Sequence, residues 1–424
     1  MIRLYTLLLF FVGTLLHSSA QTLQEQFQAA REASTSGDYP EYLRIMEQLQ
    51  ESLPENSTVL YHLGLAQIKT GDEAESLKTI RKALYRNADL PIEGDSSFLS
   101  LWDSKDFKGL TTLKQSLKSQ VATSLKAFQI DSNLLFHAEG IAYSSAKDEY
   151  FLGDIRKRQI VRYNPSTEEA IVWAQGSDLH SIMGLAVDDD RNRLWACSTP
   201  TPQMEGGLEG EISNTAFLLA YDLTTRQLIE RYPVKGDGIW LGDLILDADG
   251  NVFLSSSSQK YPAIYRLGLA EEEVQEWLHM PQLRSMQGLV LSTKSNQLFV
   301  ADYSTGLYAV SLKDRNIQKL QNQTDHPLSG IDGLYLHGDN LIAIHNGLRP
   351  FRVVSYSLGS DGTIIEDFKY LDKAIPGMNE PTLGVIVESQ LYYVSNSPWP
   401  FYNAENEFLE EKRSPCLIRS IQLN

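Results

Sequence analysis

The sequence is poor in cysteine and in basic residues, and each shortage excludes a class of protein. Two cysteines among 424 residues cannot form a disulfide framework, and they lie too far apart for the CxxC pair of a zinc ribbon. Lysine and arginine number 37 against 54 aspartate and glutamate, a formal charge of −17. The chain therefore lacks the basic surplus needed to bind nucleic acid or an anionic membrane surface.

Several catalytic motifs are also missing. The sequence has no GxSxG elbow, no HExxH, no GxGxxG and no Walker loop, which argues against the enzyme classes that depend on them. By contrast, 20 tyrosines, 15 phenylalanines and 6 tryptophans are too many for a disordered chain. At roughly 150 residues per domain, the length predicts two or three folded domains.

The first residues have the pattern of a secretion signal. Arg3 precedes an apolar run at 4–16, and Ser18 and Ala20 place small residues at −3 and −1 of a cleavage site before Gln21. We expect residues 1–20 to be a signal peptide, so that the mature protein is exported, periplasmic or secreted, with no membrane span. A retained N-terminal anchor is the alternative, although a comfortable span needs about 20 apolar residues.

Residues 21–122 have apolar residues at helical spacing and repeat every 34 residues. Gly37 recurs as Gly71, and Pro54 recurs as Ala88, at the period of a tetratricopeptide repeat. The segment resembles such repeats, which implies a helical scaffold and, through a groove, a protein partner. A generic stack of helical hairpins is the alternative.

From residue 125 onward the apolar period changes from 3.6 to 2, the period of strands. Six segments share a start with a glycine followed by apolar residues; they begin at Glu139, Met183, Gly242, Gln287, Asp332 and Leu383. Residues 131–424 are 294 residues, or 49 per repeat, which suits a four-stranded propeller blade. We therefore predict a six-bladed β-propeller at 123–424. The expected fold class is a helical repeat domain followed by an all-β propeller.

The ends of the predicted propeller indicate how the ring closes. The last blade has only three strands, and residues 124–130 have the length to supply its missing outer strand, which removes an exposed edge. The same assignment puts Cys197 in blade two and Cys416 in blade six. Because these blades do not adjoin, we expect two buried free thiols.

The inner strands of all blades begin on one face, at the central channel. Three of the six residues at these starts carry side-chain oxygens: Glu139, Gln287 and Asp332. Two carboxylates and a carboxamide on one axis are costly to bury unless a cation lies among them, and oxygen ligands suit a hard divalent ion. A hydrated channel rim that binds nothing specific is the alternative.

Loops between the second and third strands return to the same face. The polar side chains that they contribute include His345, Asn346, Arg349 and Asn396. Two connections are long, at 199–214 and 399–413, and loops of this length are usually lids or binding loops. We expect them to cover the channel mouth.

Five motifs connect residues 134–424 with a known family. They are Ala-Glu-Gly-Ile-Ala-Tyr (138–143), Met-Gln-Gly-Leu (286–289), Val-Ala-Asp-Tyr (300–303), Ile-Asp-Gly-Leu-Tyr (331–335) and Glu-Pro-Thr-Leu-Gly-Val (380–385). Together they resemble the SMP-30/gluconolactonase/LRE-like family of six-bladed propellers. The resemblance implies hydrolysis of lactones or related esters with one divalent metal ion in the channel. It implies Glu139, Gln287 and Asp332 as metal ligands, with Asp332 also as the general base.

The sequence departs from the family pattern at two positions. Gln287 stands where the family has an asparagine ligand, and Gly242-Asp243 stands where the family has Asn-Asp, so that a substrate-contacting amide is missing. We assign substrate binding to the polar residues on this face: Asp243, His345, Asn346, Arg349 and Asn396. Calcium is the expected metal, with magnesium, manganese and zinc as alternatives.

Two functions follow from these observations. The first is an exported metal-dependent hydrolase of a small lactone or ester. The second is a non-catalytic propeller that recognises a glycan, peptide or protein, with the helical segment as a second docking surface. The metal content of the purified protein distinguishes them.

Overall fold

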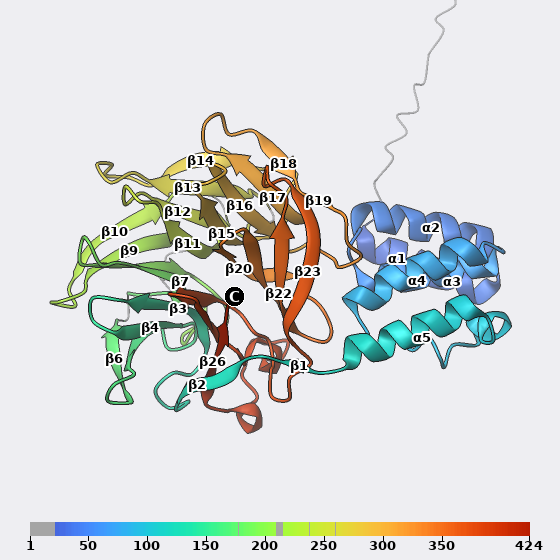
Figure 1. The fold of residues 1–424 in the computed structure, drawn as a ribbon, viewed down its shortest axis with the longest axis horizontal. Coiled ribbons are helices and arrows are strands. Elements are labelled where there is room, and N and C mark those ends of the chain that lie inside the picture. Colours follow the sequence, from blue (N-terminus) through green and yellow to red (C-terminus); the bar gives the residue numbers. More distant parts are fainter. Residues whose placement is uncertain (1–21, 177, 209–214, 237, 259) are drawn as a thin grey trace, which may run out of the picture.

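The computed structural model describes residues 22–176, 178–208, 215–236, 238–258 and 260–424. A stack of helices lies beside a ring of β-sheets (Figure 1). The predicted signal peptide at 1–20 and part of the long connection at 199–214 lie outside these ranges. Within them, no helix is both long enough and apolar enough to cross a membrane.

The N-terminal segment is helical, as predicted. Its helices are α1 (Leu23–Ser36), α2 (Tyr39–Ser52), α3 (Ser57–Lys69), α4 (Glu73–Arg86), the 3-10 helix η1 (Ser96–Leu101) and α5 (Lys105–Lys118). Gly37 ends α1 in the left-handed conformation at φ 80°, which favours glycine. A Cβ on Gly64 would lie 2.6 Å from the Ile80 side chain, so glycine lets α3 pack closely on α4. Whether these hairpins are tetratricopeptide repeats stays a prediction.

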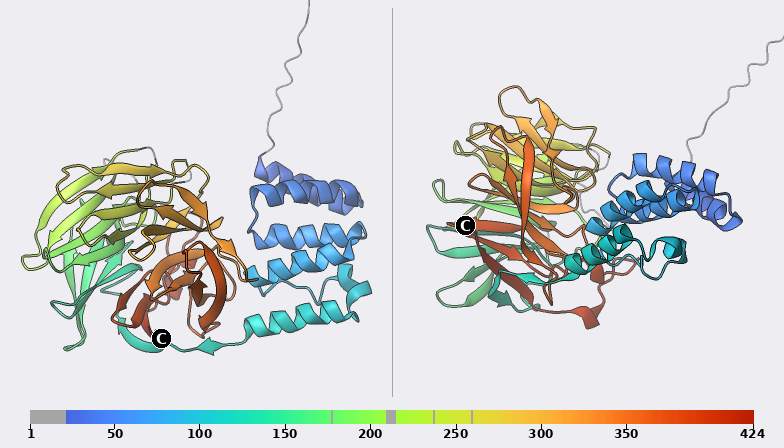
Figure 2. Two further views of the ribbon diagram at one scale, coloured as in Figure 1. Left: turned by 45° about the horizontal axis from the view of Figure 1, so that its top comes forward. Right: turned by 45° about the vertical axis from the view of Figure 1, so that its right-hand side comes forward.

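The described strands confirm the six-bladed propeller, and the blades follow each other around a ring (Figure 2). Blade one consists of β3 (Ala138–Ser144), β4 (Glu149–Asp154), β5 (Gln159–Asn164) and β6 (Glu169–Gln175). Blade two consists of β7 (Ser181–Asp188), β8 (Arg193–Thr199), β9 (Ala216–Asp222) and β10 (Leu228–Val234). Blade three consists of β11 (Leu241–Leu246), β12 (Val252–Ser256), β13 (Ala263–Leu267) and β14 (Gln275–His279). Blades four and five are β15 (Met286–Ser292), β16 (Gln297–Asp302), β17 (Gly306–Ser311), β18 (Ile317–Lys319); and β20 (Ile331–His337), β21 (Asn340–His345), β22 (Arg352–Leu358), β23 (Ile364–Lys373). Two short strands, β1 (Val121–Ala122) and β19 (Gln321–Asn322), add to β23.

Blade six closes the ring as predicted. It consists of β24 (Gly384–Val387), β25 (Gln390–Val394), β26 (Cys416–Gln422) and, from the start of the propeller, β2 (Leu125–Ile130). Because β2 pairs antiparallel with β26, the first and last parts of the propeller share one sheet. Cys197 and Cys416 are both buried free thiols, which confirms that prediction.

Close approach of the inner strands explains the repeated glycine at their starts. A Cβ on Gly140 would lie 2.3 Å from the carbonyl oxygen of Met183 in the next blade, and a Cβ on Gly288 would lie 2.5 Å from the backbone nitrogen of Leu334. Only glycine fits such a contact. The register between β3 and β4 also shifts here, between Ala138 and Ile141, an irregularity that redirects side chains. The channel residues beside these glycines are positioned by this packing.

The helical segment is joined to blade five by backbone hydrogen bonds. The Arg349 N–H donates to the Arg86 carbonyl at 2.8 Å, and the Ala88 N–H donates back to the Arg349 carbonyl at 2.9 Å. An ion pair between Arg81 and Asp325 at 2.7 Å lies beside this bridge, but both side chains are largely exposed and add little stability. The end of α4 is therefore fixed next to the propeller face that carries Arg349.

Ring closure should depend on Phe128 of β2. This side chain is buried, and its ring stacks on Tyr163 with centroids 4.0 Å apart. We expect Phe128→Ala to lower the free energy of unfolding of the propeller by about 3–5 kcal/mol, the usual cost of a large cavity. Urea unfolding followed by tryptophan fluorescence measures this change.

Leu125→Ala is the matched control, because Leu125 lies on the same strand but is 74% exposed. It should change stability by less than about 0.5 kcal/mol. Equal effects of the two substitutions would show that β2 does not close the ring through Phe128.

Candidate functional site

Four carboxyl groups lie within electrostatic reach of one another at the channel. Glu139, Asp243 and Asp332 come from the inner strands β3, β11 and β20, and all three are buried. Glu380 precedes the inner strand of blade six. Burial raises the pKa of Asp332 to about 7, and the charges of Glu380 and Asp243 add to the effect. Burial, and then repulsion by Asp332, raise the pKa of Glu139 well above its usual value.

Glu139 is held by blade six. The Trp399 indole N–H donates to Glu139 Oε2 at 2.7 Å, and the Thr382 hydroxyl donates to the Glu139 carbonyl at 2.9 Å. Trp399 belongs to the connection at 399–413, which the sequence predicts as a lid. Its indole therefore reaches the channel and fixes the orientation of this carboxylate.

Asp332 is oriented by Asn346, which the sequence assigns to substrate binding. The Asn346 Nδ2 donates to Asp332 Oδ2 at 2.7 Å. The other end of the amide, Oδ1, is buried and has no hydrogen-bond partner in the described part of the chain. A buried acceptor without a donor is costly, so this oxygen suits a cation, a water molecule or a ligand donor.

Gln287 and Asp243 lie next to each other across blades three and four. The Gln287 Nε2 donates to Ser285 Oγ at 3.2 Å, and its Oε1 would lie 3.3 Å from a Cβ on Gly242. Asp243 accepts from the backbone N–H of Leu289 at 3.4 Å, and burial raises its pKa to about 7. The Asp243 carboxylate also accepts from the Leu244 N–H of its own strand at 2.8 Å, so backbone groups of blades three and four hold it within the acid group.

Arg349 is paired with one of the acids. One of its guanidinium nitrogens, Nη2, lies 3.8 Å from Glu380 Oε2, and its Nη1 donates to the Asn346 carbonyl at 2.7 Å. Its side chain is 43% exposed, so it borders the channel without neutralising the buried carboxyls. This position agrees with a contact to a polar substrate, which stays a prediction.

His345 is buried with both ring nitrogens hydrogen-bonded inside the protein, which does not favour its assignment to substrate binding. His345 is fully buried; its Nδ1 lies 3.0 Å from the Ser329 carbonyl and its Nε2 lies 2.8 Å from the Tyr356 hydroxyl. Because a carbonyl only accepts, Nδ1 carries the proton and Nε2 accepts from Tyr356. Burial lowers the pKa of His345 to about 3, so it is neutral. Its ring supports blade five and has no nitrogen left for a ligand.

The Asn396 amide is also hydrogen-bonded within the protein, and its assignment to substrate binding stays a prediction. Its Nδ2 donates to the Pro415 carbonyl at 2.9 Å, and its Oδ1 accepts from the Leu417 N–H at 2.7 Å. Both ends of the amide therefore tie the loop after β25 to the start of β26. This is a structural role within blade six.

Sequence reasoning missed two residues of this site. The first is Glu380, the first residue of the motif at 380–385. Its place just before the inner strand of blade six is the signal in the sequence that could have found it. Tyr335 accepts a hydrogen bond from the Gly384 N–H. Burial, and then the charges of Asp243, Asp332 and Glu139, raise the pKa of Tyr335 well above its usual value. The phenol thus stays protonated among the acids.

The donor set fits a hard cation in part. Within the ranges that the structure describes, no three His, Cys, Asp or Glu side chains are close enough to form a metal cluster by themselves. The predicted ligands, however, include the amide oxygen of Gln287. The buried carboxyls of Glu139, Asp243 and Asp332, together with the Asn346 Oδ1 that has no partner in the described part of the chain, supply the oxygen chemistry that calcium or magnesium prefers.

Comparisons with known proteins support the fold. No protein-family model and no curated protein sequence matches the chain. Among solved structures, a luciferin-regenerating enzyme is similar at 13% identity and a TM-score of 0.50, over 72% of this chain and 96% of that one. This likeness supports the six-bladed propeller fold. At this identity, the likeness shows the fold alone.

Two further solved structures resemble the propeller. One is a candidate gluconolactonase, with 14% identity over 73% of this chain and 95% of that one and a TM-score of 0.49. The other is the calcium-binding protein regucalcin from Agrobacterium tumefaciens, with 15% identity over 70% and 94% and a TM-score of 0.49.

The acid group should make the metal-free protein less stable as the pH rises. The pKa of Asp332 is 3.8 in the reference state and about 7 in the folded protein. Its contribution to stability is therefore fully present below about pH 4 and is lost as the pH rises through 7. In the presence of a chelator, we expect the Tm of the wild type to fall between pH 5 and pH 8 relative to that of Asp332→Asn, whose amide cannot ionise.

Differential scanning fluorimetry at half-unit pH steps tests this. The buried neutral histidines favour stability at higher pH, but they are present in both proteins and cancel in the comparison. Parallel Tm curves for the two proteins would contradict a raised pKa at Asp332.

Proposed function

We propose that the protein is an exported, metal-dependent hydrolase of lactones or related esters, with its active site in the propeller channel. The observation that carries the proposal is the Asp332–Asn346 pair. The buried Asp332 carboxyl has a pKa of about 7, and the Asn346 amide beside it has an oxygen without a partner among the described residues. A carboxyl with a pKa near the working pH is suited to general base catalysis.

Asp332 is the proposed base that takes a proton from the attacking water. The Asn346 amide donates to Oδ2 and so leaves Oδ1 as the acceptor for this proton. Burial of Glu139, Asp243 and Asp332 restricts bulk water, which keeps the pKa of the base raised. Tyr335 remains a phenol among these acids and can donate a hydrogen bond to an oxygen of the substrate.

Glu139, Gln287 and Asp332 are the residues that would hold one divalent ion, calcium first and magnesium, manganese or zinc as alternatives. Such an ion polarises the ester carbonyl and stabilises negative charge on its oxygen. Trp399 fixes Glu139, and Ser285 fixes the amide of Gln287, so both side chains are oriented before any ligand arrives. Asp243 and Arg349 are the proposed contacts to the substrate.

A binding protein without catalysis is the second candidate function. It is favoured by a hollow between α1, α2 and α3, about 380 Å³ in volume and lined in part by Phe27, Tyr42 and Met46. The proposed occupant is a peptide from a protein partner of the tetratricopeptide-like segment. Export is also part of the proposal, and it is supported by the signal-peptide pattern of residues 1–20.

Asp332→Ala should abolish turnover while the protein stays folded. Loss of a general base lowers kcat by roughly 10²–10⁴-fold. The assay is hydrolysis of aldonolactones and aryl esters in the presence of calcium, magnesium, manganese or zinc, with circular dichroism to check folding. Asp339→Ala is the matched control, because Asp339 is an exposed acid in the same blade, between β20 and β21.

Metal analysis of the purified protein separates the two functions. One divalent ion per chain that is lost in Gln287→Ala supports the hydrolase. Full activity of Asp332→Ala would remove Asp332 from the mechanism. A protein with neither metal nor hydrolysis would support the binding function.

A further inference from the structure

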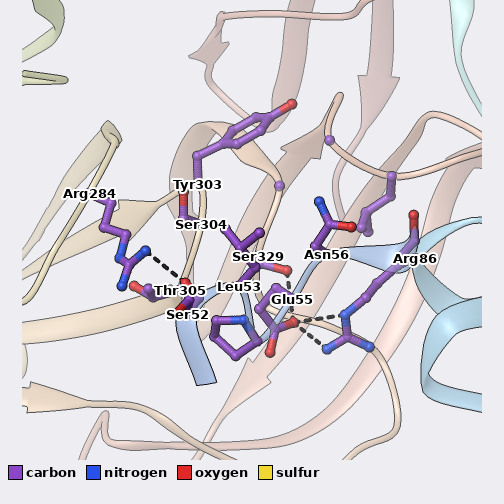
Figure 3. Close-up of a pocket in the computed structure, with 15 residues that line it drawn as sticks. Ser52, Leu53, Glu55, Asn56, Arg86, Arg284, Tyr303, Ser304, Thr305 and Ser329 are labelled. Carbon is purple, nitrogen blue, oxygen red and sulfur yellow. Dashed lines mark hydrogen bonds and ion pairs between the residues drawn. The ribbon is translucent and has the colours of Figure 1, made fainter. Parts of the chain in front are cut away.

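A cleft lies between the helical segment and the propeller, on the face where the inner strands begin (Figure 3). Its volume is about 260 Å³, near the lower end of the roughly 300–1,000 Å³ of small-molecule sites. The turn between α2 and α3 forms one wall. The opposite wall comes from loops of blades four and five, including Tyr303, Ser304 and Gly347.

The cleft carries an excess of positive charge in an acidic protein. Arg86, Arg284 and Glu55 line it, two guanidinium groups against one carboxylate. Glu55 is paired with Arg86 and accepts a hydrogen bond from Ser329 Oγ at 3.0 Å. Its charge is therefore balanced by Arg86.

Arg284 supplies the remaining charge. Its Nη1 donates to the Ser52 carbonyl at 2.7 Å, a neutral acceptor. No ion pair of Arg284 occurs among the described residues. Guanidinium groups bind carboxylates through two parallel hydrogen bonds, so this side chain is suited to an anionic group in the cleft.

The cleft adjoins the channel through Tyr303. This residue lines the cleft, and the charges of Glu380, Asp332 and Arg349 all act on its phenol. Gly347 also lines the cleft and directly follows Asn346, the partner of Asp332. The cleft therefore lies next to the channel that holds Asp332.

We propose that this cleft binds the carboxylate-bearing end of a hydroxylated substrate, so that the preferred substrate is the lactone of a sugar diacid. The hydroxyl of Ser304 faces the same cleft as Arg284 and suits the hydroxyl groups of such a molecule. The helical segment then has a direct role, because its α2–α3 turn builds one wall of the substrate site. The link to hydrolysis rests on the proposed function, whereas binding of the carboxylate does not.

Calorimetric titration with glucarate in the presence of a chelator tests the binding step without any metal. Glucarate has two carboxylates, gluconate has one, and sorbitol has none. We expect glucarate and gluconate both to bind, because one carboxylate suffices for Arg284, and sorbitol not to bind. Arg284→Gln should weaken glucarate binding by about tenfold or more, the usual effect of losing a charged hydrogen bond.

Two further variants complete the test. Glu55→Gln removes a carboxylate from the cleft wall and should tighten glucarate binding several-fold. Arg315→Gln is the matched control, because Arg315 also donates to a backbone carbonyl, that of Trp277, but lies outside the cleft. It should leave binding unchanged.

The outcomes distinguish this inference from the proposed function. Binding of glucarate that depends on Arg284, with no hydrolysis of any lactone, would keep the cleft and overturn the hydrolase. Hydrolysis of neutral lactones with equal glucarate affinity in wild type and Arg284→Gln would overturn the cleft. Sulfate binding as tight as glucarate binding would also overturn it, because a bare anion site needs no sugar acid.

Discussion

The structure depends on the close contact of inner strands around the channel. Glycines at the strand starts let neighbouring backbones meet where any Cβ would clash, as Gly140 does against Met183. That contact brings Glu139, Asp243 and Asp332 within electrostatic reach although they are far apart in sequence. The packing energy of the ring thus offsets the cost of burying mutually repelling acids, and it creates a site that favours a cation or a proton donor.

The helical segment and the acid group are physically connected. Glu55 accepts from Ser329, whose carbonyl accepts from His345, and the next residue along the chain, Asn346, orients Asp332. Three of these steps are hydrogen bonds, and the step from His345 to Asn346 is a covalent link of the chain. The contact between the α2–α3 turn and blade five therefore also helps to fix the amide that faces the proposed base.

Much of the fold could be predicted from the sequence because the relevant signals are local. The six strand starts and the closing strand at 124–130 follow from periodicity, and Glu139 and Asp332 follow from their place before a glycine. The roles of His345 and Asn396 could not be predicted. Loop position alone does not tell whether a polar side chain points into the channel or into the protein interior. The polar atoms of both residues form hydrogen bonds with backbone groups of the protein.

The two departures from the family pattern are coupled in space. Sequence reasoning treats Gln287 and Gly242 as separate losses, one at the metal and one at the substrate. In the structure, a Cβ at position 242 would lie 3.3 Å from Gln287 Oε1 and 3.1 Å from Ser257 Oγ, so a side chain there would compete with the longer glutamine. Gly242 makes room for the extra methylene of Gln287, and the amide oxygen that blade three lacks is replaced by one that reaches across from blade four. The two positions therefore act on one part of the channel, and a side chain at position 242 would require a shorter residue at position 287.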